Sequence, residues 1–197
     1  MTNSTAQLTF RFEEALTYAF RLHANQVRKV DGTPYIAHLL SVTALVLEAG
    51  GDEDEAIAAL LHDAVEDQGG LQTLDEIRQR FDERVAEIVD GCTDAYVIPK
   101  PPWRGRKVAY LEHLREAPGS VRLVSLADKL HNARCLYQDL RQNGERVWEA
   151  FNGGKEGTLW YYRTLSEIFQ ETGADTLTAE FVDVVRKIEE AQETKNG

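Results

Sequence analysis

Apolar residues recur at intervals of three and four along almost the whole chain, which is the spacing of one face of an α-helix. Such faces are formed by Phe12, Leu16, Ala19, Phe20 and His23, and by Leu177, Phe181, Val184, Val185 and Ile188. No convincing stretch alternates apolar and polar residues in the way that a half-buried strand does. The sequence therefore predicts an all-α protein.

Clusters of glycine and proline interrupt this pattern at about 30–34, 48–54, 67–70, 98–105, 116–120 and 152–157. These breaks predict about eight to ten helices joined by short loops. A chain of 197 residues suits one domain, so we expect a single compact multi-helix bundle over 1–197. Its core should span about 8–170, followed by a C-terminal helix at about 176–192 and a frayed tail.

The charge of the chain restricts its partners. With 33 acidic and 22 basic residues the formal charge is -11, which argues against a general nucleic-acid or anionic-membrane binder. No apolar run approaches the roughly 20 residues of a membrane span, and the N-terminus lacks the pattern of a signal peptide. We therefore expect a cytoplasmic protein in which Cys92 and Cys135 remain free thiols. Homo-oligomer formation is compatible with the sequence.

One predicted helix, from about Glu53 to about Asp67, has a continuous polar arc opposite its apolar arc. The polar arc consists of His62, Asp63, Glu66 and Asp67. An ordinary solvated surface is one interpretation. The adjacent His-Asp pair, however, offers one nitrogen and one oxygen ligand, and three crowded carboxylates would repel one another without a cation.

Two further polar residues lie within apolar helical stretches. His38 follows the "DGTPY" turn and has apolar neighbours, so it is either a candidate ligand or a core histidine bonded to a backbone carbonyl. Asp128 lies on a stripe with Ser125, Asn132 and Cys135 in "SVRLVSLADKLHNARCLY". A buried, unpaired aspartate costs several kcal/mol, so Asp128 requires a cation. The alternative to a metal is a salt bridge to a nearby Lys129, Arg122 or Arg134.

Together, His38, His62, Asp63 and Asp128 would form a mixed nitrogen and oxygen set suited to manganese, iron or zinc, with open positions for water. The order H…HD…D is the signature of HD-domain metal phosphohydrolases. The surrounding segments "RKVDGTPYIAHLLSV", "AALLHDAVED", "GCTDAYVIPKPPWRGRK" and "LVSLADKLHNAR" closely resemble the hydrolase domain of RelA/SpoT-type stringent-response proteins and of small alarmone hydrolases. The resemblance covers about Ala15 to Phe169.

This resemblance implies an HD-domain bundle that hydrolyses the 3′-pyrophosphate of guanosine tetra- or pentaphosphate, (p)ppGpp, to GDP or GTP and pyrophosphate. It implies manganese(II) as the usual metal and a metal-activated water as the nucleophile. It also implies that Glu66 and Asp67 position or deprotonate this water, whereas the alternative is that they only solubilise the helix. The synthetase domain of the long family members is expected to be absent.

Basic residues supply the expected substrate contacts. The resemblance implies that Arg28 stacks on the purine, that Lys29 contacts its edge and that Asn132 lies near the sugar or base. A second cationic group, suited to the distal phosphates, comprises Lys100, Arg104, Arg106 and Lys107, although it could also be a solvated loop. Cys135 replaces a threonine that is frequent in the long enzymes, which leaves the base preference open.

Two other functions fit these residues. One is an HD phosphohydrolase for another nucleotide, such as (p)ppApp, the phosphate of NADPH or a nucleoside monophosphate. The other is a nucleotide sensor without catalysis. We assign His23, His113 and His131 to packing or the surface, and we leave Tyr161 and Tyr162 outside the catalytic set.

Overall fold

The computed structural model describes residues 6–173 and 176–193, and most of these lie in helices. The elements are α1 (Phe10–Leu22), α2 (Ile36–Glu48), α3 (Glu53–Leu61), α4 (Ala64–Gln68), α5 (Leu71–Phe81), α6 (Glu83–Cys92), α7 (Trp103–Glu116), α8 (Gly119–Asn143), the 3₁₀-helix η1 (Gly144–Ala150), α9 (Gly154–Thr172) and α10 (Thr176–Glu193). The all-α prediction is confirmed. Residues 194–197, the end of the predicted frayed tail, lie outside the described residues.

Local chemistry explains where several helices begin. The Asp52 side chain accepts from the amide of Glu55, and the Glu55 side chain accepts from the amide of Asp52, which satisfies two free amides at the start of α3. At the start of α1, the side chain of Thr9 accepts a hydrogen bond from the amide of Arg11. Helices α7 and α8 start directly after Pro102 and Pro118, because a proline disfavours helical backbone in the residue before it.

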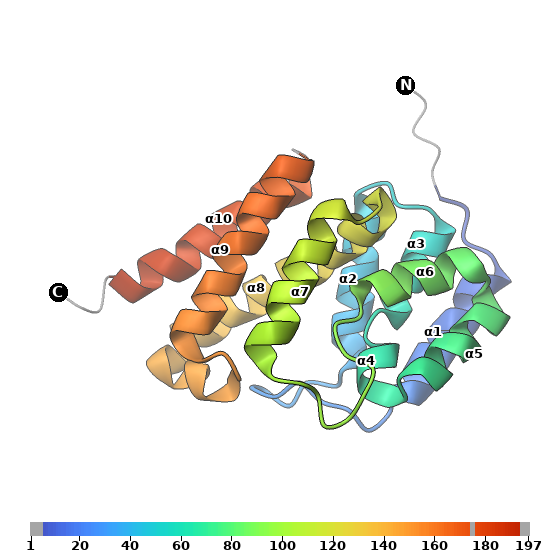
Figure 1. Ribbon diagram of the computed structural model, residues 1–197, viewed down its shortest axis with the longest axis horizontal. Coiled ribbons are helices and arrows are strands. Elements are labelled where there is room, and N and C mark those ends of the chain that lie inside the picture. Colours follow the sequence, from blue (N-terminus) through green and yellow to red (C-terminus); the bar gives the residue numbers. More distant parts are fainter. Residues whose placement is uncertain (1–5, 174–175, 194–197) are drawn as a thin grey trace.

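Helix α8 is the centre of the packing, with contacts to α2, α3, α6, α10 and η1. In Figure 1, α9 and α10 lie at one end of the molecule, and α1 and α5 lie at the other. A single hydrophobic cluster receives residues from every α-helix of the described chain. All five apolar residues named for the face of α10 are buried, whereas Phe20, which shares the apolar spacing of α1, is 57% exposed.

A glycine allows α6 and α8 to approach closely. A Cβ atom on Gly91 of α6 would lie 2.6 Å from a methyl group of Val121 on α8, so no larger residue fits without movement. Val121 is itself buried. The small residue therefore helps to define the position of α8, which carries Asp128 about two turns beyond Val121.

The predicted continuous helix from Glu53 to Asp67 is wrong, because the helix is interrupted at His62 and Asp63, between α3 and α4. The Nδ1 atom of His62 lies 2.8 Å from the carbonyl oxygen of Ala59, the acceptor that the amide of Asp63 would use in a continuous helix. The imidazole thus replaces a backbone hydrogen bond. As a result, His62 ends one helix and Asp63 begins the next.

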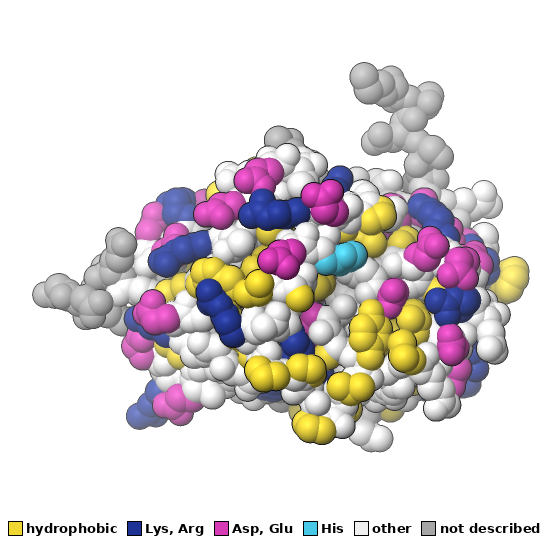
Figure 2. All heavy atoms as spheres, in the orientation of Figure 1, with side chains coloured by type: hydrophobic (Ala, Val, Ile, Leu, Met, Phe, Trp, Pro, Cys, Tyr) yellow, Lys and Arg dark blue, Asp and Glu magenta, His cyan; other side chains and the backbone are white. Residues whose placement is uncertain are grey.

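The surface is mixed in charge. Figure 2 shows acidic and basic side chains interspersed over the face in view. Across the described residues, none of the helices has the length and apolar character needed to cross a membrane.

Candidate metal centre and nucleotide cavity

Four predicted ligands from separate elements lie together. His38 comes from the first turn of α2, His62 and Asp63 from the junction of α3 and α4, and Asp128 from α8. Ligand atoms of His38, His62 and Asp128 all lie within 4.8 Å of one another, and these three residues are buried. Asp63 is beside them, since its Oδ2 lies 3.1 Å from His62 Nε2 and 3.5 Å from His38 Nε2.

The geometry fits a divalent cation. The Nε2 atoms of His38 and His62 are buried and have no hydrogen-bond partner, although both rings point at carboxylates. Asp128 Oδ1 lies 3.2 Å from His38 Nε2 and 3.6 Å from His62 Nε2. Metal bonds of about 2.1 Å at right angles place neighbouring ligand atoms about 3 Å apart. The converging lone pairs therefore surround a point that one ion can occupy.

The charges of the cluster also call for a cation. Burial opposes the charged form of His62, but the carboxylates of Asp63 and Asp128 outweigh it and raise the pKa of His62 well above its usual value. Burial would raise the pKa of Asp63, yet the neighbouring imidazoles lower it well below its usual value. A metal ion can take the place of the proton that this cluster attracts.

The salt-bridge alternative for Asp128 and the ligand hypothesis use different oxygens. The ammonium group of Lys129 contacts Oδ2 of Asp128, while Oδ1 faces the two histidines. Asn132 also donates to Oδ1. Lys129 therefore neutralises one side of this buried carboxylate and leaves the other directed at the cluster.

Two residues that sequence reasoning left out support the candidate ligands. The hydroxyl of Tyr35 donates to Oδ2 of Asp63 over 2.6 Å, and Nδ1 of His131 lies 2.8 Å from Nδ1 of His38. His131 was assigned to packing or the surface. Their spacing in the sequence could have indicated these two residues. Tyr35 precedes His38 by three residues and His131 follows Asp128 by three, so each pair lies on one face of a helix.

The acidic pair Glu66 and Asp67 lies on α4 next to the cluster. Lys100 donates to Glu66 Oε1 and to Asp67 Oδ1, both over 2.8 Å, and Gln26 donates to the other oxygen of Asp67 over 2.8 Å. Burial, with the negative charges of Asp94 and Asp63, raises the pKa of Glu66. Glu66 is therefore a candidate proton acceptor.

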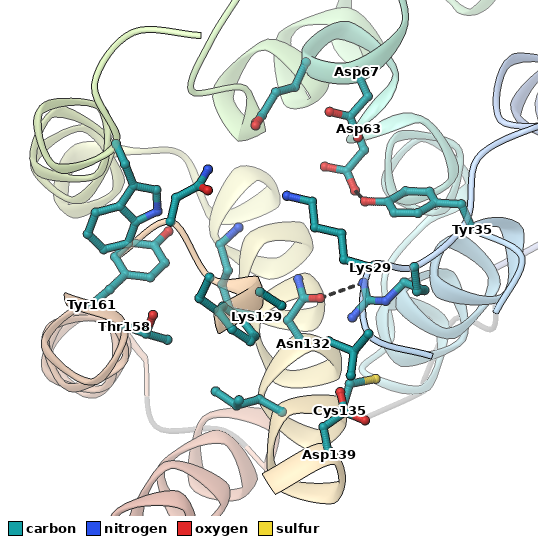
Figure 3. Close-up of a pocket in the computed structure, with 18 of the residues that line it drawn as sticks. Lys29, Tyr35, Asp63, Asp67, Lys129, Asn132, Cys135, Asp139, Thr158 and Tyr161 are labelled. Carbon is teal, nitrogen blue, oxygen red and sulfur yellow. Dashed lines mark hydrogen bonds between the residues drawn. The ribbon is translucent and has the colours of Figure 1, made fainter. Parts of the chain in front are cut away.

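A cavity of about 540 Å³ opens beside these residues. Asp63, Glu66 and Asp67 form part of its wall, and Thr158 and Tyr161 of α9 lie across from Lys29 (Figure 3). The volume suits a nucleotide-sized ligand.

Six of the seven predicted substrate-binding residues line this cavity: Arg28, Lys29, Lys100, Arg106, Lys107 and Asn132. The seventh, Arg104, is not in the wall; its guanidinium lies over the ring of Trp160, 3.1 Å from the centroid. Asp94 pairs with both Arg106 and Lys107, which holds these two cations at the cavity. Tyr161, Tyr162 and Cys135 also contribute to the wall.

Comparison with known proteins assigns the class. Residues 15–159 match the HD domain, and the chain belongs to the HD-domain family. It is 38% identical over 148 residues to the guanosine-3′,5′-bis(diphosphate) 3′-pyrophosphohydrolase MESH1 of Xenopus tropicalis, covering 73% of this chain and 80% of that protein. It is 39% identical over 172 residues to MESH1 of Mus musculus, covering 81% and 93%.

A solved structure supports the same relationship. It is described as a metazoan ortholog of SpoT that hydrolyzes ppGpp and plays a role in starvation responses. The two folds superpose with a TM-score of 0.75 at 27% identity, over 92% of this chain and 97% of the other. The predicted resemblance to the SpoT type of HD domain is thereby confirmed.

Proposed function

We propose that this protein is a metal-dependent hydrolase that removes the 3′-pyrophosphate of (p)ppGpp, giving GDP or GTP and pyrophosphate. One observation carries the proposal: two unpartnered histidine nitrogens and two carboxylates converge beside a nucleotide-sized cavity lined by cations. The MESH1 proteins, which carry this activity in their name, are similar over most of their length.

In this proposal His38, His62, Asp63 and Asp128 hold a divalent cation, with manganese(II) as the expected ion. When bound, such an ion lowers the pKa of a water molecule and polarises a phosphate oxygen. Nitrogen and carboxylate ligands suit manganese, iron and zinc alike, so the identity of the metal is part of the proposal.

The protein residues divide the remaining tasks. Glu66, with its raised pKa, accepts a proton from the attacking water. Asp67 has both oxygens hydrogen-bonded, so it holds Lys100 in place rather than exchanging a proton. Water attacks the phosphorus next to the 3′ oxygen, and the bond between them breaks with its electron pair on the 3′ oxygen, which takes up a proton from solvent. Lys100, Arg106 and Lys107 line the cavity and would neutralise the oxygens of the pyrophosphoryl group that is transferred to water.

Arg28 would hold the purine at the other side of the cavity, since a planar guanidinium stacks on aromatic rings. Its Nη1 donates to Asn132 over 2.9 Å, which fixes the orientation of the plane (Figure 3). Lys29 lies nearby in the same wall. Cytoplasmic location and homo-oligomer formation stay predictions.

The test is product identification with purified protein loaded with manganese. Guanosine and adenosine carrying 3′-pyrophosphates are compared with NADPH and with a nucleoside monophosphate. Release of pyrophosphate from the guanosine compound, lost in Asp63→Asn, supports the proposal. Release of orthophosphate from NADPH or the monophosphate instead would contradict it and favour another HD phosphohydrolase.

The adenosine compound is included because of Cys135. This thiol lines the cavity where long family members often have threonine, and a thiol is a weaker hydrogen-bond donor than a hydroxyl. Comparable rates with both bases would support hydrolysis of (p)ppApp as a second activity. Nucleotide binding without turnover would identify a sensor and contradict catalysis.

A further inference from the structure

Two imidazoles face each other across the boundary between α2 and α8. The Nδ1 atoms of His38 and His131 are 2.8 Å apart, and their ring centroids are 4.8 Å apart. His38 is buried, and His131 is half-buried. A distance of 2.8 Å between two nitrogens is that of a hydrogen bond, so one proton lies between them.

The opposite nitrogen of His38 determines which ring carries this proton. His38 Nε2 faces the carboxylates of Asp128 and Asp63 at 3.2 Å and 3.5 Å, and it must keep its lone pair to bind a cation there. A neutral imidazole has a single N–H, so the proton of His38 belongs on Nδ1. Nδ1 of His131 must then be the acceptor.

His62 uses the same arrangement with a different acceptor. Its Nδ1 donates to the carbonyl oxygen of Ala59, which directs the lone pair of Nε2 at the cluster. A backbone carbonyl can only accept. His38 relies instead on a side chain that must be in one of its two tautomers, with the His131 proton on Nε2.

We propose that His131 is a positioning residue whose Nδ1 accepts the Nδ1–H of His38 and thereby holds His38 in the tautomer and ring orientation that present Nε2 to the divalent cation. The inference rests on the proposed function, because it requires a cation at this cluster. Without His131, a buried N–H of His38 would lose its acceptor, and the ring could turn or adopt the other tautomer, with its hydrogen on Nε2.

The test compares manganese affinity, measured by calorimetry with manganese(II) chloride alone, in three variants. His131→Leu removes the acceptor and should weaken binding about 10- to 100-fold. His131→Asn places an amide oxygen close to the position of Nδ1 and should restore much of the affinity. His113→Leu removes an exposed imidazole on α7 and should bind as the wild type does.

Wild-type affinity in a folded His131→Leu protein would overturn the inference, as would an Asn variant no better than the Leu variant. Absence of manganese binding by the wild-type protein is a different result, which would overturn the proposed function and the inference together.

A second measurement needs no variant. Long-range ¹H–¹⁵N spectra of the zinc-loaded wild-type protein distinguish protonated from unprotonated ring nitrogens. We expect the proton of His38 on Nδ1 and that of His131 on Nε2. A proton on Nδ1 of His131 would overturn the inference, whether or not His131→Leu folds.

Discussion

Glu66 and Asp67 are adjacent acids with different surroundings. Both oxygens of Asp67 accept hydrogen bonds, one from Lys100 and one from Gln26. Glu66 accepts from Lys100 through Oε1, and burial with nearby negative charge raises its pKa. In the proposed mechanism the two carboxylates therefore have different tasks: Glu66 accepts a proton, and Asp67 helps to hold Lys100.

This difference gives the first prediction. Glu66→Gln keeps the shape of the side chain but removes the proton acceptor, so kcat should fall about 10²- to 10⁴-fold while manganese content stays at the wild-type level. Asp67→Asn should lose less, because its amide oxygen can still accept from one partner. Pyrophosphate release and metal analysis on the same samples provide the measurement. Equal kcat values for wild type and Glu66→Gln would contradict the assignment.

The second prediction concerns the phenol of Tyr35. Tyr35→Phe removes the hydrogen bond to Asp63 Oδ2 and leaves the ring against His23, so manganese affinity should fall about tenfold in a folded protein. Tyr96→Phe is the matched control, since it removes a 2.7 Å hydrogen bond from a tyrosine to Asp90 away from the cluster. Equal manganese affinity in both variants would contradict a role for the Tyr35 hydroxyl in metal binding.

The sequence patterns indicated which residues are candidate ligands, but they did not indicate which side chains hydrogen-bond to those ligands. His38, His62, Asp63 and Asp128 were proposed from polar residues in apolar helices, and the structure brings them together. Tyr35 was not singled out, and His131 was assigned to packing or the surface because it matched no ligand role. Spacing places them on the same helix faces as His38 and Asp128, but it does not show that their hydrogen bonds reach Asp63 and His38 on other elements.

At the scale of elements, the pattern predicted helices well and their interruptions less well. The buried face of α10 follows directly from its apolar spacing. The break between α3 and α4 does not, because Leu60, Leu61, Ala64 and Val65 continue the apolar pattern across it. The break occurs where the His62 imidazole, rather than a backbone amide, bonds to the carbonyl oxygen of Ala59. Hydrophobic periodicity carries no information about such a side-chain hydrogen bond.

Close packing of two helices gives the third prediction. Gly91→Ala should destabilise the protein by about 1–3 kcal/mol, because the new methyl group overlaps Val121 on α8. Gly105→Ala on α7 meets nothing within 4 Å and should instead stabilise by about 0.5–1 kcal/mol through helix propensity. Urea unfolding of both variants measures the difference. A neutral Gly91→Ala would mean that α6 and α8 separate easily.

The whole molecule has a net charge of -11, yet its cavity wall contains five basic residues that were predicted to bind the substrate. The overall acidity predicts that any anionic ligand is held by local positive charge, and this stays a prediction. Which cations reach the cavity was not predictable, since Arg104 belongs to the same basic segment as Arg106 yet stacks on Trp160. One helical turn contains both, and their directions differ.

Metal binding should stabilise the entire fold, because the candidate ligands connect α2, α3, α4 and α8. At a free manganese concentration of 100 times Kd, the stabilisation should be about 2.7 kcal/mol. Thermal unfolding with manganese and with a chelator measures the shift in Tm, and Asp128→Asn should abolish it. An unchanged Tm in the wild-type protein at saturating manganese would contradict a site that connects these helices.

Arg28 donates to Asn132, and Asn132 donates to Asp128, so a single amide joins the residue proposed to hold the base to a candidate metal ligand. Occupancy at the two ends is then thermodynamically coupled: if the cation tightens nucleotide binding by some factor, the nucleotide must tighten cation binding by the same factor. A protein of this design would retain its ion most firmly while its substrate is abundant and release it more readily when the nucleotide is depleted.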